Sequence, residues 1–196
     1  MRWATSDHHW GHWRLNTTYC QATRGFPTVE EMNAQLVARW NESIAPDDEV
    51  LLVGDAFCSR RMTLDEKVGI LRMLHGRKTL VRGNHDDDLR PFTLAGFEAI
   101  VDHIWMPDER ILVIHKGPDP RYAPAELAVR DRLDPALVVH GHDHRHDTPD
   151  APGCLNVCVD RWGLRPVPWA TIEAHLPRAH QITPDSHQQE EIGYHG

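Results

Sequence analysis

The sequence contains no apolar run close to the about 20 residues that a membrane-spanning helix requires. The stretch from Met1 to Asp7 also has no apolar core of the kind that defines a signal peptide. Cysteine is scarce: there are 4 in 196 residues, with no Cys-x-x-Cys pair and no spacing typical of a small disulfide framework. We therefore expect no membrane contact, no disulfide scaffold and a cytoplasmic location.

Basic residues are also few. Lys and Arg together number 21 against 29 Asp and Glu, which gives a formal net charge of −8 at pH 7. Proteins that bind long nucleic acids usually carry clustered Lys and Arg. We therefore expect no extended nucleic-acid-binding surface, and the composition leaves the oligomeric state open.

The length suits one domain, and the composition is that of an ordinary globular chain, with 40% hydrophobic and 26% charged residues. Apolar runs typical of buried strands alternate with segments of helical periodicity. Helices are expected near residues 28–45, 63–75, 89–94, 123–133 and 170–176, and strands near 2–6, 50–53, 79–81, 98–105, 110–114, 136–139 and 155–159. This pattern predicts an α/β domain over residues 1–176, followed by a polar, flexible tail at 177–196.

Asp, Asn and His residues follow five of the expected strands. The five blocks are Asp7-His8-His9, Gly54-Asp55, Gly83-Asn84-His85-Asp86, Ile114-His115 and Gly141-His142-Asp143-His144. Neutral imidazole is a good ligand for divalent transition metals. Any one block is a weak signal, because a pair such as Gly-Asp occurs by chance in most chains. Together, in this order and at strand ends, the blocks predict a metal centre.

The order of the blocks resembles the calcineurin-like metallophosphoesterase superfamily, whose pattern is Asp-x-His, Gly-Asp, Gly-Asn-His-Asp/Glu, a lone His and Gly-His-x-His. Residues 156–162 and 165–167 are similar to the closing segment of small bacterial and phage-type members without a cap domain. The resemblance covers about residues 3 to 176. It implies an α/β fold in which two mixed β-sheets pack as a sandwich flanked by helices.

The resemblance also implies a site for two divalent ions, which in such centres lie about 3.5–4 Å apart and generate hydroxide from water. One ion would be bound by Asp7, His9, Asp55 and His144, and the other by Asp55, Asn84, His115 and His142. A donor set rich in imidazole favours Mn, Fe, Zn or Ni over Ca or Mg, with Mn preferred here. The ions would add about four positive charges at the site, which suits a small phosphate ester.

Two residues next to the ligands are candidates for catalysis. By resemblance, His85 faces the substrate, where it would stabilise transition-state charge or protonate the leaving oxygen. Asp86 is placed to orient that imidazole, and the alternative is a solvated loop carboxylate.

Four further residues are candidates for contact with substrate or for support of the ligands. His12 follows the first block, and Lys116 departs from the Tyr or Pro that many relatives have after the lone His. Trp10 and Trp13 either offer a stacking face to a nucleobase or pack in the core and shield the site.

The leading prediction is a dinuclear metal-dependent phosphoesterase that hydrolyses phosphodiesters, including nucleotide-type ones. The alternative is a phosphomonoesterase of the same fold. A non-catalytic metal-binding scaffold is a third hypothesis, which the intact set of candidate ligands argues against.

Overall fold

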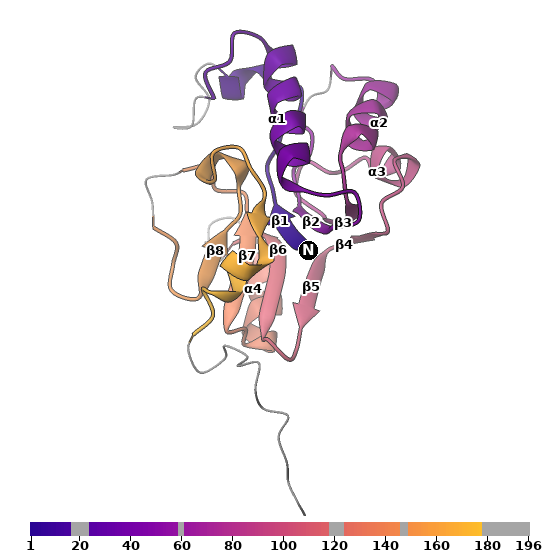
Figure 1. Ribbon diagram of the computed structural model, residues 1–196. Coiled ribbons are helices and arrows are strands. Elements are labelled where there is room, and N and C mark those ends of the chain that lie inside the picture. Colours follow the sequence, from indigo (N-terminus) through magenta and orange to yellow (C-terminus); the bar gives the residue numbers. More distant parts are fainter. Residues whose placement is uncertain (17–23, 59–60, 118–123, 146–148, 178–196) are drawn as a thin grey trace, which may run out of the picture.

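Two β-sheets pack face to face, and helices cover their outer faces (Figure 1). The computed structural model describes residues 1–16, 24–58, 61–117, 124–145 and 149–177. The strands are β1 (Arg2–Thr5), β2 (Glu49–Val53), β3 (Arg77–Val81), β4 (Ala99–Val101), β5 (His103–Met106), β6 (Ile111–Lys116), β7 (Leu137–Gly141), β8 (Cys154–Asn156) and β9 (Val167–Pro168). The helices are α1 (Val29–Ser43), α2 (Leu64–Met73), α3 (Arg90–Leu94), α4 (Pro124–Leu133) and α5 (Trp169–Glu173), with 3-10 turns at Trp13–Asn16 and Val159–Arg161.

Both sheets are mixed, as expected. The first has the order β4-β3-β2-β1-β9, in which β9 alone runs antiparallel to its neighbour. The second has the order β5-β6-β7-β8, in which β5 is the antiparallel strand. The parallel strands of each sheet therefore bring their carboxyl ends to one edge, where ligand sites of α/β proteins commonly lie.

Side chains of the central strands point alternately to the two faces of each sheet, and this divides the core into layers. In β2, Val50 and Leu52 pack under α1 and α2, whereas Leu51 and Val53 face the second sheet. Successive side chains of a strand point to opposite faces, so a continuous apolar run serves two apolar layers at once. The second sheet repeats this arrangement, with a smaller outer cluster under α4 that includes Leu112.

Three expected elements differ from those observed. The single strand expected over residues 98–105 is two strands, β4 and β5, because the chain crosses from one sheet to the other at Asp102. The strand expected over 155–159 ends at Asn156, and the chain continues into a 3-10 turn. The last helix lies at Trp169–Glu173 and is preceded by the short strand β9, which periodicity does not reveal.

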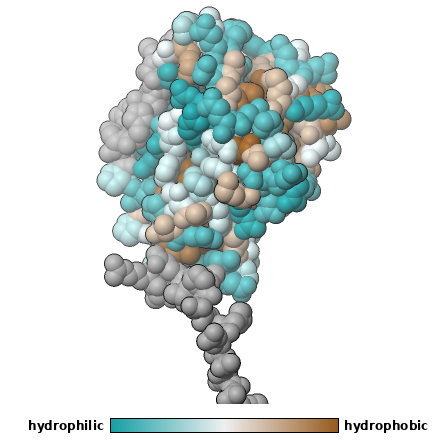
Figure 2. Space-filling view, viewed as in Figure 1, coloured by the Kyte–Doolittle hydropathy of each residue, from teal (hydrophilic) through white to brown (hydrophobic). Residues whose placement is uncertain are grey.

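Hydrophilic side chains predominate on the face shown in Figure 2. Within the described ranges, no helix is both long and apolar enough to cross a membrane. The expected flexible tail at 177–196 lies outside the described residues, apart from Pro177.

Candidate metal centre

Candidate ligands from both sheets meet at the carboxyl ends of the strands. Asp7 follows β1, Asp55 follows β2 and Asn84 follows β3, while His115 lies near the end of β6 and His142 follows β7. Residues separated by more than a hundred positions are thereby brought to one edge of the sandwich.

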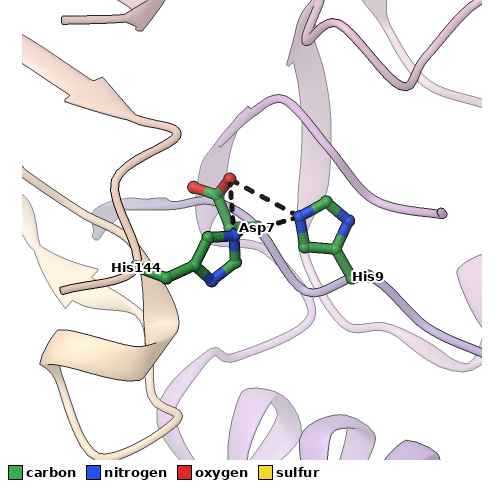
Figure 3. Close-up of side chains that lie close together, drawn as sticks. All are labelled: Asp7, His9 and His144. Atoms are coloured by element: carbon green, nitrogen blue, oxygen red, sulfur yellow. Dashed lines mark hydrogen bonds and ion pairs between the residues drawn. The ribbon is translucent and has the colours of Figure 1, made fainter. Parts of the chain in front are cut away.

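The first group consists of Asp7, His9 and His144 (Figure 3). The Nε2 atoms of His9 and His144 lie 3.8 and 3.6 Å from Oδ1 of Asp7. The two Nε2 atoms are 3.2 Å from each other. Asp7 and His9 are buried, and the side chain of His144 is only 10% exposed, so three donor atoms converge in a space largely closed to water.

The second group consists of Asp55, His115 and His142. Oδ2 of Asp55 lies 3.3 Å from Nε2 of His115 and 3.7 Å from Nε2 of His9, which belongs to the first group. One carboxylate oxygen is thus shared between the two groups. The groups are also linked through the backbone, because the amide of His142 donates to Oδ2 of Asp7 at 2.8 Å.

Hydrogen bonds on the far side of two imidazoles leave their inner nitrogens available as ligands. Nδ1 of His115 donates to the carbonyl oxygen of Val53 at 2.8 Å, and Nδ1 of His144 lies 2.6 Å from Oδ2 of Asp160. The proton is then held on Nδ1, and Nε2 points its lone pair into the centre. Among the described residues, Oδ1 of Asp7 and Nε2 of His115 are buried without a hydrogen-bond partner. Buried polar atoms are rarely left unpaired, so these donors fit divalent metal ions.

The electrostatics also favour positive charge inside the centre. Burial alone would lower the pKa of His115, but the neighbouring Asp55 carboxylate and the charge of Asp7 raise it to about 9. Burial would raise the pKa of Asp55, but its contacts with His115 and His9 hold that pKa well below the usual range. The pocket therefore stabilises a cation between these groups, a role that a bound metal ion would fill.

Several of the ligands have unusual backbone conformations. Seven non-glycine residues in the described ranges have positive φ, and four of them are candidate ligands: Asp7 (59°), His9 (48°), Asp55 (56°) and His142 (70°). This conformation costs about 1–3 kcal/mol per residue and persists only where the surroundings impose it. Here the amides of Asp7 and His9 donate to the carbonyls of Gly54 and Asp55, at 3.0 and 3.1 Å. The strain is held in place by contacts between the ligand loops.

Asn84 and His85 lie on the open side of the centre. Both are exposed, and the backbone amide of His85 donates to Oδ1 of Asp55 at 2.9 Å. The imidazole of His85 is 44% exposed, with Nε2 3.9 Å from Oδ2 of Asp55, so a substrate can reach it. Its Nδ1 atom lies 3.5 Å from Sγ of Cys58, a neighbour that the sequence did not suggest.

The role expected for Asp86 is wrong. Its carboxylate is buried and accepts three backbone amides, those of Asp55 at 2.8 Å, Gly83 at 2.9 Å and Ala56 at 3.3 Å. Burial and the charge of Asp55 raise the pKa of Asp86 to about 6. Asp86 is neither a solvated loop residue nor the partner of the His85 imidazole, because its oxygens are committed to the loop that carries Asp55.

Trp10 also differs from the expectation that it contacts a base. It is fully buried, stacks on His8 with ring centroids 4.3 Å apart, and packs near Trp40 and Phe57. The core alternative is confirmed for Trp10, because no ligand can reach its faces.

The other three candidate contacts remain accessible to different degrees. Trp13 is 51% exposed and lines a cavity of about 570 Å³ between α1 and α2. His12 is partly exposed, with its ring centroid 6.0 Å from that of His9. Lys116 is half-buried at the end of β6.

Two functional candidates were missed at the sequence level. Arg24 lies in a polar loop without a motif, and Asp160 lies in the closing segment without an assigned role. The structure pairs them beneath His144, with Arg24 Nε 2.8 Å from Oδ1 of Asp160. Nothing in the local sequence pattern of either residue signals this pairing.

A two-sheet sandwich with Asp and His side chains gathered at its strand ends defines a metallophosphoesterase-type domain. The chain belongs to the calcineurin-like phosphoesterase superfamily, whose domain model matches residues 4–159. The resemblance found in the motifs is thereby confirmed for the family and for the fold class.

Two proteins are similar to this chain in sequence, and one solved structure is similar in fold. An uncharacterized protein of Methanocaldococcus jannaschii is 27% identical over 168 residues, which cover 83% of this chain and 83% of that protein. The gene 66 protein of Mycobacterium phage L5 is 27% identical over 189 residues, covering 82% and 87%. The crystal structure of a protein of unknown function from Aquifex aeolicus matches with a TM-score of 0.71 at 23% identity, covering 89% of this chain and 98% of that one. The last likeness supports the fold.

Proposed function

We propose that this chain is a dinuclear metal-dependent phosphoesterase that hydrolyses phosphodiesters. The observation that carries the proposal is the position of Asp55, whose Oδ2 lies within 3.7 Å of a ligand nitrogen in each of the two groups. We assign one ion to Asp7, His9 and His144, and the other to Asp55, His115 and His142. The family resemblance adds Asp55 to the first set and Asn84 to the second. The mixed imidazole and oxygen donors suit Mn, Fe, Zn or Ni, with Mn preferred.

When bound, two such ions neutralise phosphate charge and lower the pKa of water. The chain's own residues supply the remaining functions. His85 is exposed beside Asp55, where its imidazole can donate a proton to the leaving oxygen. Lys116, at the end of the same strand as His115, contributes positive charge for a substrate phosphate.

The proposal is tested by metal analysis combined with hydrolysis of bis- and mono-p-nitrophenyl phosphate. A diesterase carries two ions per chain and prefers the bis ester, whereas preference for the mono ester would indicate a phosphomonoesterase. A protein that binds metal and cleaves neither ester would be a scaffold. Asp87→Asn is the matched control, because Asp87 is exposed in the same loop as Asn84 and should leave both readouts unchanged.

The acid role of His85 is tested separately with two leaving groups. An alkyl diester expels a poor leaving group that needs a proton, whereas p-nitrophenolate leaves readily as an anion. His85→Ala should keep both ions and lose about 10²–10⁴-fold in kcat/KM on alkyl diesters, with a distinctly smaller loss on p-nitrophenyl esters. Equal losses on both would assign His85 to charge stabilisation or substrate positioning instead.

A further inference from the structure

A buried ion pair lies directly beneath the first group of ligands. Nε and Nη2 of Arg24 donate to Oδ1 and Oδ2 of Asp160 at 2.8 and 3.0 Å. The two side chains are only 1% and 2% exposed. Removing two charges from water is costly, and packing apolar residues in their place is often as stable. Stability alone therefore does not explain why this ion pair is buried here, and its contacts indicate another role.

Asp160 also contacts His144. Its Oδ2 atom lies 2.6 Å from Nδ1 of the imidazole, which places the proton on Nδ1. The unprotonated Nε2 atom then offers its lone pair to a metal ion on the side of Asp7 and His9. A rotation of the imidazole, or the opposite tautomer, would remove that lone pair from the first group.

Arg24, which holds Asp160, also contacts the backbone of the segment that carries Asp7 and His9. Its Nη2 donates to the carbonyl of Asp7 at 2.7 Å, and its Nη1 donates to the carbonyl of His8 at 2.6 Å. Asp7 has φ of 59°, so its peptide orientation depends on such contacts. One guanidinium therefore joins the backbone of the Asp7–His9 segment to the carboxylate that holds His144.

In the second group, His115 has a different kind of partner. The corresponding Nδ1 atom of His115 is held by the neutral carbonyl of Val53, 2.8 Å away. A carboxylate partner increases the electron donation of an imidazole more than a carbonyl does. The imidazoles of His144 and His115 are therefore supported differently.

We propose that Asp160, held by Arg24, is a positioning residue that selectively sets the affinity of the metal ion assigned to Asp7, His9 and His144. The inference rests on the proposed metal centre and names a residue pair that controls one half of it. Its consequence is that the two ions respond differently to loss of Asp160.

His144, Cys158 and Asp160 also lie close enough together to suggest a third metal site. The contacts argue against it. Arg24 already occupies both oxygens of Asp160, and Nδ1 of His144 faces the same carboxylate. Burial raises the pKa of the Cys158 thiol well above its usual value, so a thiolate ligand is disfavoured. This cluster supports the first group of ligands and is not a site of its own.

The test is calorimetric titration of the metal-free protein with Mn²⁺, for the wild type and for Asp160→Asn. The Asn side chain has the shape of Asp, but its NH₂ group would face one of the two hydrogen-bond donors, Arg24 or His144, and could not accept from it. The affinity for one ion should fall about 10–100-fold while the other is retained. Asp150→Asn is the matched control: Asp150 pairs with Arg161 at 2.8 Å, with side chains 20% and 16% exposed, and should leave both ions unaffected.

A second readout does not depend on any variant folding. Nitrogen-15 NMR of the metal-free wild type should show a proton on Nδ1 of the His144 imidazole, where Asp160 accepts it. A wild-type His144 without a proton on Nδ1, equal loss of both ions, or unchanged affinities in Asp160→Asn would each overturn the role of Asp160. A wild type that binds no metal would instead overturn the proposed metal centre, so the two failures are distinguishable.

Discussion

The Nε2 atoms of His9 and His144 face each other at 3.2 Å, although the residues lie 135 positions apart in the chain. Nδ1 of His144 is held by Asp160, so its Nε2 points a lone pair toward the other imidazole. Such an arrangement requires a proton or a cation between the rings. The same holds for the centre as a whole, where lone pairs of nitrogen and oxygen atoms converge without enough hydrogen-bond donors to pair with them.

Asp55→Asn should reduce occupancy of both metal ions. The Oδ2 atom of Asp55 lies near ligand nitrogens of both groups, at 3.3 and 3.7 Å, so an uncharged amide weakens both. Each affinity should fall by at least the roughly 10–100-fold typical of losing a supporting partner. Elemental analysis after dialysis measures this, with Asp87→Asn as the control. Loss of a single ion would show that Asp55 does not bridge.

Gly83→Ala should displace the Asp55 carboxylate. A Cβ atom at Gly83 would lie 2.1 Å from Oδ1 of Asp55 and 2.5 Å from its backbone nitrogen, which no real structure accommodates. We expect loss of metal binding together with lower stability in thermal unfolding. Gly69→Ala is the contrasting change, since a Cβ there meets nothing within 4 Å inside α2. It should raise the free energy of unfolding by about 0.5–1 kcal/mol and spare the metals. Full metal occupancy in Gly83→Ala would contradict the prediction that a Cβ at this position displaces the Asp55 carboxylate.

The two tryptophans near the first block should respond in opposite ways. Trp10→Ala leaves a cavity in the core and should lower the free energy of unfolding by about 3–5 kcal/mol. Trp13→Ala removes a half-exposed ring and should change stability little. If Trp13 stacks on a nucleobase, the variant raises KM for nucleotide diesters and spares a non-nucleotide aryl diester. Equal effects on the two substrates would remove the base-stacking hypothesis.

Alkylation of Cys154 should require unusually high pH. Burial raises the pKa of this thiol to about 11, so the neutral form persists to higher pH than in a free thiol. At pH 8 only about one molecule in a thousand carries the reactive thiolate, which is the nucleophile in alkylation. Peptide mass spectrometry of iodoacetamide-treated protein across pH 7–11 measures this, with glutathione as the reference thiol. A half-maximal rate below pH 9.5 would contradict the burial effect.

Local pattern was enough to predict the elements that carry the site. Continuous apolar runs marked β2 and β7, and the block order placed Asp55 and His142 just after strands. These features depend on neighbours along the chain, which the sequence displays directly. The same local information could not show that residues 98–105 divide between two sheets, because both halves read as strand.

The family and the candidate ligands were thus indicated by the sequence itself, since the motif blocks and their order can be read along the chain. The two-sheet fold followed from the family resemblance, because strand periodicity alone does not show a sandwich. The tertiary structure decided that Trp10 is buried and that Asp86 serves the backbone of the Asp55 loop. It also decided that Arg24 and Asp160, 136 residues apart, meet beneath His144. Burial and hydrogen-bond partners depend on which distant segments come together in space, and no pattern along the chain encodes that.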